Sequence, residues 1–120
     1  MISNIDEKYV HAGKWSRRKI FKSISDESKS VIRLEKFILS QKKEIETLLN
    51  TAAKLVERDI NTEALSEFIQ ATKNNLLRLD LQMIDVSIKE YASNIAHAEQ
   101  ELHVHTLNRQ FLKMKYKEKL

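Results

Sequence analysis

Apolar residues recur every seven positions along the first half of the chain. The longest such row consists of Ile24, Val31, Ile38, Ile45 and Ala52. A second row stands three residues further on and contains Leu34, Leu48 and Leu55, with Gln41 as its one polar member. Two rows offset by three in a seven-residue repeat fall on one narrow stripe of a helix, which is typical of a coiled-coil seam. A repeat of about 3.5 residues per turn also requires the helix to supercoil around a partner.

A second helical pattern follows after a short polar interruption. The periodicity lapses over residues 57–62, where Asn61 or Thr62 can cap a new helix that has Glu63 in its first turn. A connection this short makes the two helices antiparallel neighbours. The predicted first arm, turn and second arm are residues 14–56, 57–62 and 63–118.

The composition supports an all-α fold. The 120 residues include one Gly and no Pro, so the turns that several strands would need are missing. The sequence therefore predicts a single domain over residues 1–120, in which two long helices form an antiparallel coiled-coil hairpin. Folding back at residues 57–62 would place Ile24 opposite Ile95 and Val31 opposite Ile88. A homodimeric coiled coil without a hairpin fits the same pattern.

The start of the chain predicts a short lead-in helix over residues 1–13. Asn4 and Glu7 have the spacing of a capping box, in which each side chain satisfies a free backbone amide. Gly13 weakens a helix by up to about 1 kcal/mol relative to alanine. It marks either a joint before the first arm or a tolerated flaw in a continuous helix.

Two apolar ladders share the second arm. The first contains Leu65, Phe68, Ile69, Thr72, Leu76, Leu79, Met83 and Val86, and the second contains Leu81, Ile84, Ile88, Tyr91, Ile95, Ala98, Leu102, Leu112 and Tyr116. They overlap between Leu76 and Val86, where the apolar face is wider than one seam requires. A stutter in the coil explains the overlap, and so does a second contact surface on Leu76, Leu79, Met83 and Val86.

Basic residues gather near both ends of the chain. The two groups contain five cations each, and Glu118 is the one acid among them: Lys14, Arg17, Arg18, Lys19, Lys22, Arg109, Lys113, Lys115, Lys117 and Lys119. A hairpin places the two groups side by side, with Trp15, Phe21, Phe111 and Tyr116 exposed among them. These cations either solvate the helix ends or form a docking surface for an acidic partner.

Motifs for catalysis or metal binding do not occur. His103 and His105 are two residues apart and so point to different sides of a helix, and no HExxH or ExxH arrangement includes His97. The chain has no cysteine, no secretory signal at its start and no apolar run of about eighteen residues. The sequence therefore predicts a cytoplasmic protein that is not an enzyme, inserts into no membrane and uses no metal, cofactor or small-molecule substrate.

The basic segment Lys14–Lys22, the two long antiparallel helices, the short central turn and the Lys-rich end Arg109–Leu120 together resemble a known family. They are similar to the central stalk of the bacterial type III secretion ATPase, the YscO/FliJ-like family. The resemblance covers the whole chain in size, architecture and charge. It implies a stalk, peripheral to the inner-membrane secretion apparatus, whose basic end enters the pore of a hexameric ATPase and promotes its assembly and activity.

The same resemblance implies further partners. The remainder of the stalk would reach the export gate, with Leu76, Leu79, Met83 and Val86 as the candidate contact, and secretion chaperones could bind as well. Two other classes stay open, a small cytosolic secretion chaperone or scaffold that captures a helical client and a nucleic-acid-binding hairpin. Nucleic acid is not the expected partner, because the cations occupy one end and the aromatic residues are not interleaved as stacking platforms.

Overall fold

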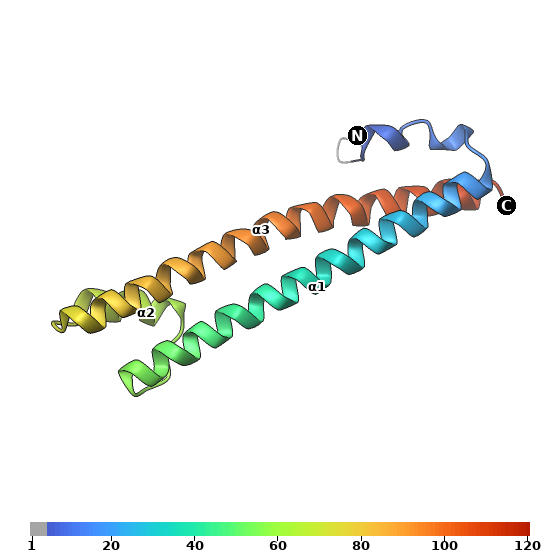
Figure 1. Cartoon of the computed structure of the whole chain (residues 1–120). Coiled ribbons are helices and arrows are strands. Elements are labelled where there is room, and N and C mark those ends of the chain that lie inside the picture. The colour runs from blue at the N-terminus through green and yellow to red at the C-terminus, as the bar shows by residue number, and fades with distance from the viewer. Residues whose placement is uncertain (1–4) are drawn as a thin grey trace. The chain divides into compact units, whose positions relative to one another are not determined.

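The computed structural model describes residues 5–120, and over that range the chain forms helices and no strand (Figure 1). Its elements are the short 3-10 helices η1 (Glu7–Tyr9) and η2 (Ala12–Lys14) and the helices α1 (Arg17–Val56), α2 (Thr62–Ala71) and α3 (Asn75–Glu118). The prediction of two long helices is confirmed, because α1 has 40 residues and α3 has 44. Within the described range, no helix is long and apolar enough to cross a membrane.

The lead-in consists of η1 and η2 rather than one short helix. The predicted cap at Asn4 lies outside the described residues, and Asp6 caps η1 by accepting a hydrogen bond from the Lys8 amide at 3.4 Å. Gly13 lies within η2. It therefore belongs to the lead-in and does not interrupt α1.

The first helix ends in a left-handed residue that is not glycine. Glu57 has φ 59°, and the Arg58 amide donates to the Ala53 carbonyl at 3.1 Å. This bond from the second residue after the cap back into the last turn is the Schellman arrangement that ends many helices. The helix start that follows uses one of the two capping residues indicated by the sequence, because Asn61 Oδ1 accepts from the Ala64 amide at 2.8 Å.

The prediction of one continuous second arm over residues 63–118 is wrong. Thr72 leaves α2 in an extended conformation, and Asn74 starts α3 by accepting a hydrogen bond from the Leu77 amide at 3.1 Å. Arg78 then donates to the carbonyl oxygens of Ile69 and Thr72, which satisfies acceptors that the end of α2 leaves open. The first ladder thus begins on α2 and continues on α3 from Leu76, whereas the second ladder lies on α3 alone.

The contacts divide the chain into two units, and each is described by itself. The central unit is Ile38–Ala96. Its buried core contains Ala52 from α1, Leu65 from α2, and Leu81, Ile84 and Ile88 from α3. Leu65 and Ala52 are fully buried because α2 packs where the two long helices leave their apolar sides uncovered.

Pairing within the central unit shows that the predicted register is wrong. The Asn94 side-chain amide donates to Gln41 Oε1 at 3.1 Å, so the one polar member of the seam has a polar partner. A fold-back at residues 57–62 would instead place Arg78 opposite Gln41. Arg78 is roughly four helical turns from Asn94 along the helix. The difference arises because the chain reverses direction through the loop, α2 and the second break, and not through the first loop alone.

The terminal unit consists of the described residues up to Phe37 together with His97–Leu120. It contains the lead-in, the first part of α1 and the last part of α3. Its buried cluster is formed by Tyr9, Ala12, Ile20, Phe111 and Leu112. The lead-in therefore supplies two of the five core residues and is part of the packed unit.

Candidate docking site in the terminal unit

The lead-in is attached to the two helices of the terminal unit by buried polar contacts as well as by apolar packing. The Tyr9 hydroxyl donates to Glu27 Oε1 at 2.7 Å, and the Asp6 amide donates to Asn108 Oδ1 at 3.0 Å. Glu27 lies on α1 and Asn108 on α3, and both are buried. One short segment therefore holds contacts with each helix.

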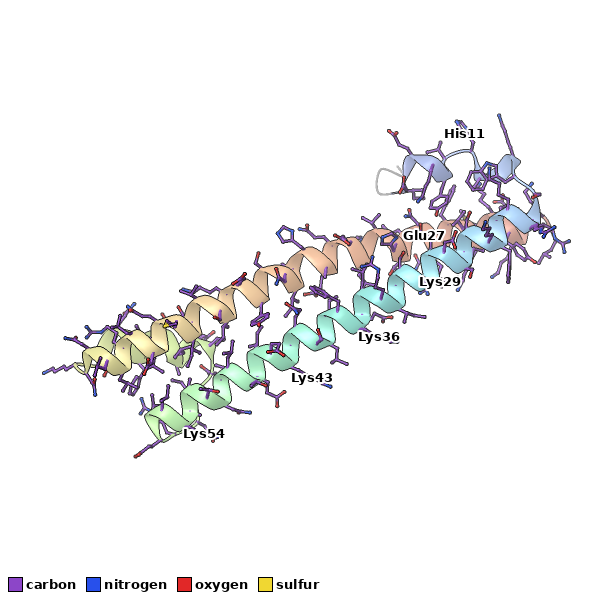
Figure 2. All side chains as sticks on the ribbon, viewed as in Figure 1. His11, Glu27, Lys29, Lys36, Lys43 and Lys54 are labelled. Atoms are coloured by element: carbon purple, nitrogen blue, oxygen red, sulfur yellow. The ribbon has the colours of Figure 1, made fainter. Side chains whose placement is uncertain are left out.

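Glu27, which is labelled on α1 in Figure 2, is the centre of a three-residue network with Tyr9 and His105. Only 2% of the residue is exposed, and its second carboxylate oxygen contacts His105 Nδ1. A buried carboxylate is costly unless it has polar partners, and here the Tyr9 hydroxyl donates to one oxygen while the His105 ring contacts the other. Burial first, and then the hydrogen bond to Glu27, raises the pKa of Tyr9 above its ordinary value of 10.0.

Only one of the two polar groups of the Asn108 side chain has a hydrogen-bond partner in the described part of the chain. Its oxygen accepts from Asp6, whereas its Nδ2 is buried without a hydrogen-bond partner in the described part of the chain. The buried side chain nevertheless fixes where the lead-in crosses α3, because a buried amide favours the arrangement that pairs at least one of its groups.

All ten predicted cations of the ATPase-binding site lie in the terminal unit. Those from the lead-in and α1 are exposed, and so are Lys113 and Lys117, whereas Arg109, Lys115 and Lys119 are half-buried. The segments that carry the two groups are in contact. The Arg17 guanidinium lies 5.9 Å from the Tyr116 ring, and Gly13 lies so close to Lys115 that a Cβ atom added to the glycine would be 3.9 Å from Lys115 Cδ. The two basic segments are thus neighbours in space.

Aromatic residues accompany these cations. The rings of Phe21 and Tyr116 are 6.2 Å apart, and together with Arg17 and Arg18 they line a shallow pocket. The Lys19 ammonium lies 4.1 Å from the Trp15 ring. Phe21 is 62% exposed, so the pocket combines an open apolar ring with two guanidinium groups. Such a combination suits a partner that offers carboxylates beside apolar side chains.

The expectation that Phe111 is exposed is wrong. It is only 8% exposed and packs in the cluster with Tyr9 and Ile20. The lead-in covers this part of α3, which the helical pattern of the sequence could not show. Trp15 and Tyr116 are half-buried, so Phe21 is the most open of the four aromatic residues.

Few of these ten cations form a salt bridge with an acidic side chain of the same molecule. Among residues 5–120, one of the ten forms a salt bridge: Lys115 Nζ lies 3.5 Å from Glu118 Oε2. Exposed like charges this close repel one another, and an acidic partner would relieve the repulsion. The terminal unit therefore presents an open positive surface, to which we refer as the basic docking patch.

The four residues considered for the export gate lie on α3 in the central unit. Leu76, Leu79, Met83 and Val86 are between 57% and 77% exposed, whereas Leu81, Ile84 and Ile88 on the same helix are buried. This segment of α3 thus has one covered and one open apolar stripe. The open stripe belongs to the central unit, whereas the basic docking patch belongs to the terminal unit.

The histidines do not form a metal site in residues 5–120, where no group of three potential ligands lies close together. His97 and His103 are exposed, and His105 is half-buried against Glu27. His11, on the lead-in, is exposed as well (Figure 2).

Glu27 and Asn108 are not among the functional residues that the sequence pattern predicts. Glu27 stands seven residues before Leu34 and so occupies the second row of the seam, where a charged residue is unexpected. That position signals a buried carboxylate that needs a partner. Asn108 has no comparable signal, because the residue that it binds comes from the lead-in.

Comparison with known proteins finds no matching family, no matching curated protein and no matching solved structure.

Proposed function

We propose that this chain is a non-enzymatic central stalk of a type III secretion ATPase. Its basic docking patch binds acidic groups in the pore of the hexamer, promotes assembly and hydrolysis, and links the ATPase to the export gate. The observation that carries the proposal is the meeting of ten cations from two distant segments in one unit, with one internal salt bridge among them. The choice of the secretion-stalk family rests on the resemblance of the sequence to that family.

The pairing of α1 with α3 is part of the same proposal. We infer that α1 and α3 pair as an antiparallel coiled-coil hairpin, because in the terminal unit Arg17 lies beside Tyr116 whereas Glu27 contacts His105, so residue numbers rise along α1 as they fall along α3. Glu27 contacts His105 in the terminal unit, and Gln41 accepts from Asn94 in the central unit. Polar residues at seam positions specify register in coiled coils. These two contacts are therefore the ones expected to align the helices.

The test is ATP hydrolysis by the candidate secretion ATPase, with and without the chain, at low and high salt. We expect stimulation that fades as salt rises, together with a shift of the ATPase to hexamers in analytical ultracentrifugation. Exposed charge pairs are screened beyond about 10 Å at 0.1 M salt, so a contact of this kind must be salt-sensitive. No stimulation and no shift at any salt concentration would refute the proposal.

A pair of variants locates the contact. The docking variant carries Arg17→Glu, Arg18→Glu, Lys113→Glu and Lys117→Glu, and the control variant carries Lys42→Glu, Lys54→Glu, Lys73→Glu and Lys89→Glu. All eight residues are exposed, and both variants change the net charge equally. The docking variant should lose stimulation while retaining its helicity in circular dichroism, and the control should keep both. Equal loss in the two variants would mean that net charge, and not this patch, is responsible.

A second candidate function is supported by the open apolar stripe on α3. A stripe of four large apolar residues fits the apolar face of a client helix, as in a small secretion chaperone or scaffold. Leu79→Lys with Met83→Lys should then abolish client binding without affecting stimulation of the ATPase. If the chain binds helical clients at one-to-one stoichiometry and never stimulates an ATPase, this second function replaces the first.

A further inference from the structure

A line of cations runs along the outer face of α1 in the terminal unit, apart from most of the basic docking patch. Lys22, Lys29 and Lys36 are seven residues apart, and Arg33 stands between the last two, so the four share one face of the helix. All four are exposed. In Figure 2, Lys29 and Lys36 lie along the same edge of α1, on the side away from α3. We call this face the α1 stripe.

The α1 stripe remains net positive within the molecule, although the exposed Asp26, four residues after Lys22 and three before Lys29, stands on the same face. No salt bridge in the described range involves any of its four cations. Lys29 and Arg33 are four residues apart and Arg33 and Lys36 are three apart, spacings at which like charges destabilise a helix. The helix therefore carries a repulsion that an external polyanion would relieve.

Bulky apolar side chains border the same face. Phe21 and Ile32 are 62% and 51% exposed. They stand eleven residues apart, close to three full turns, so they lie on one edge of the stripe. A row of cations beside exposed aromatic and aliphatic groups is the pattern by which a helix lies at the surface of an anionic bilayer, with ammonium groups at the phosphates and apolar groups at the acyl boundary.

We propose that the α1 stripe binds an anionic lipid surface. Phosphates of nucleic acid would engage the same cations, but an exposed Ile32 contributes nothing to a contact with a phosphate backbone. The lipid surface uses both the charges and the apolar edge. This site goes beyond the proposed stalk function. It shares Lys22 with the cations of the docking patch, and its apolar edge includes Phe21, which lines the pocket of that patch.

The test is sedimentation of the full chain with vesicles of phosphatidylcholine alone, or of equal parts phosphatidylcholine and phosphatidylglycerol. We expect binding to the anionic vesicles only, weakening as salt rises. The stripe variant Lys29→Gln, Arg33→Gln and Lys36→Gln should reduce the affinity on the order of a hundredfold. Ile32→Ser should reduce it about fivefold, through the lost apolar contact.

The matched control replaces Lys42, Lys73 and Lys89 by Gln, which removes the same charge from exposed positions outside the stripe. It should bind vesicles nearly as well as the unchanged chain. The stripe variant should also keep its helicity and its effect on the ATPase, so that failure of this site and failure of the docking patch are distinguishable. Equal binding to neutral vesicles, or an unaffected stripe variant, would overturn the proposal. Binding to duplex DNA with none to vesicles would overturn it in favour of nucleic acid.

Discussion

Removing one hydroxyl group should loosen the lead-in. Tyr9→Phe keeps the ring in the buried cluster of the terminal unit but deletes the donor that reaches Glu27 at 2.7 Å. A hydrogen bond to a charged, buried group contributes about 1.5 to 3 kcal/mol, and removing its donor leaves a carboxylate oxygen without that partner. With Glu27 only 2% exposed, water cannot replace the hydroxyl. We expect a loss of about 2 kcal/mol in the free energy that holds the lead-in in place.

Amide hydrogen exchange is the appropriate assay, because the lead-in can open without unfolding α1. The amides to follow are those of Asp6, which donates to Asn108, and Tyr9, which donates to the Asp6 carbonyl. A loss of about 2 kcal/mol should accelerate their exchange about thirtyfold. The Leu65 amide in the central unit donates to the Asn61 carbonyl and serves as the internal control, with no change expected.

The pH dependence supplies a second check with a definite sign. The pKa of Tyr9 is raised in the folded state, so the stability that its hydroxyl contributes is fully present below about pH 10 and is lost as pH rises through the raised value. The difference between the unchanged chain and Tyr9→Phe should therefore be constant between about pH 7 and 9 and shrink above about pH 10. Lead-in amides that exchange within about threefold of the unchanged chain at neutral pH would refute this account.

Four further substitutions test the local structure by urea unfolding. Glu57→Gly should stabilise the chain by about 1 kcal/mol, because glycine adopts φ 59° without the penalty that a side chain incurs; a destabilisation would refute the left-handed end of α1. Asn74→Ala should cost about 1 kcal/mol through the lost cap to the Leu77 amide, and no cost would argue against the break before α3. Leu65→Ala should cost about 2 to 5 kcal/mol, whereas Leu76→Ala, at 77% exposure, should stay within about 0.5 kcal/mol; equal costs would contradict the packing of α2.

The second half of the chain shows where a helical pattern misleads. The first ladder, from Leu65 onward, and the second, through Leu81, both repeat at three and four residues, so the pattern predicts one helix. Periodicity records which side of a helix is apolar but does not record a break of three residues. The signal for the break was the pair Asn74 and Asn75 after Thr72, since asparagine is a strong N-cap and a poor residue in a helix interior.

The sequence predicts the charges of the candidate docking site but not which of its aromatic residues are exposed. The ten cations were identified from the sequence, and their occurrence in one unit follows from helices that return along the chain. The exposure of individual aromatic residues was not predictable, because it depends on the lead-in. Residues in 3-10 turns have no periodic pattern that would indicate where they pack.

The sequence by itself determined that the chain is helical and where its first long helix runs, because the lack of proline, the near absence of glycine and a seven-residue apolar repeat act locally. It also determined where the charges gather. Only the tertiary structure decided the register of α1 on α3, the burial of Glu27 and the covering of Phe111. Each of these depends on a segment, α2 or the lead-in, that packs against residues distant in sequence. Such contacts are set by which apolar surfaces remain uncovered once the long helices have formed.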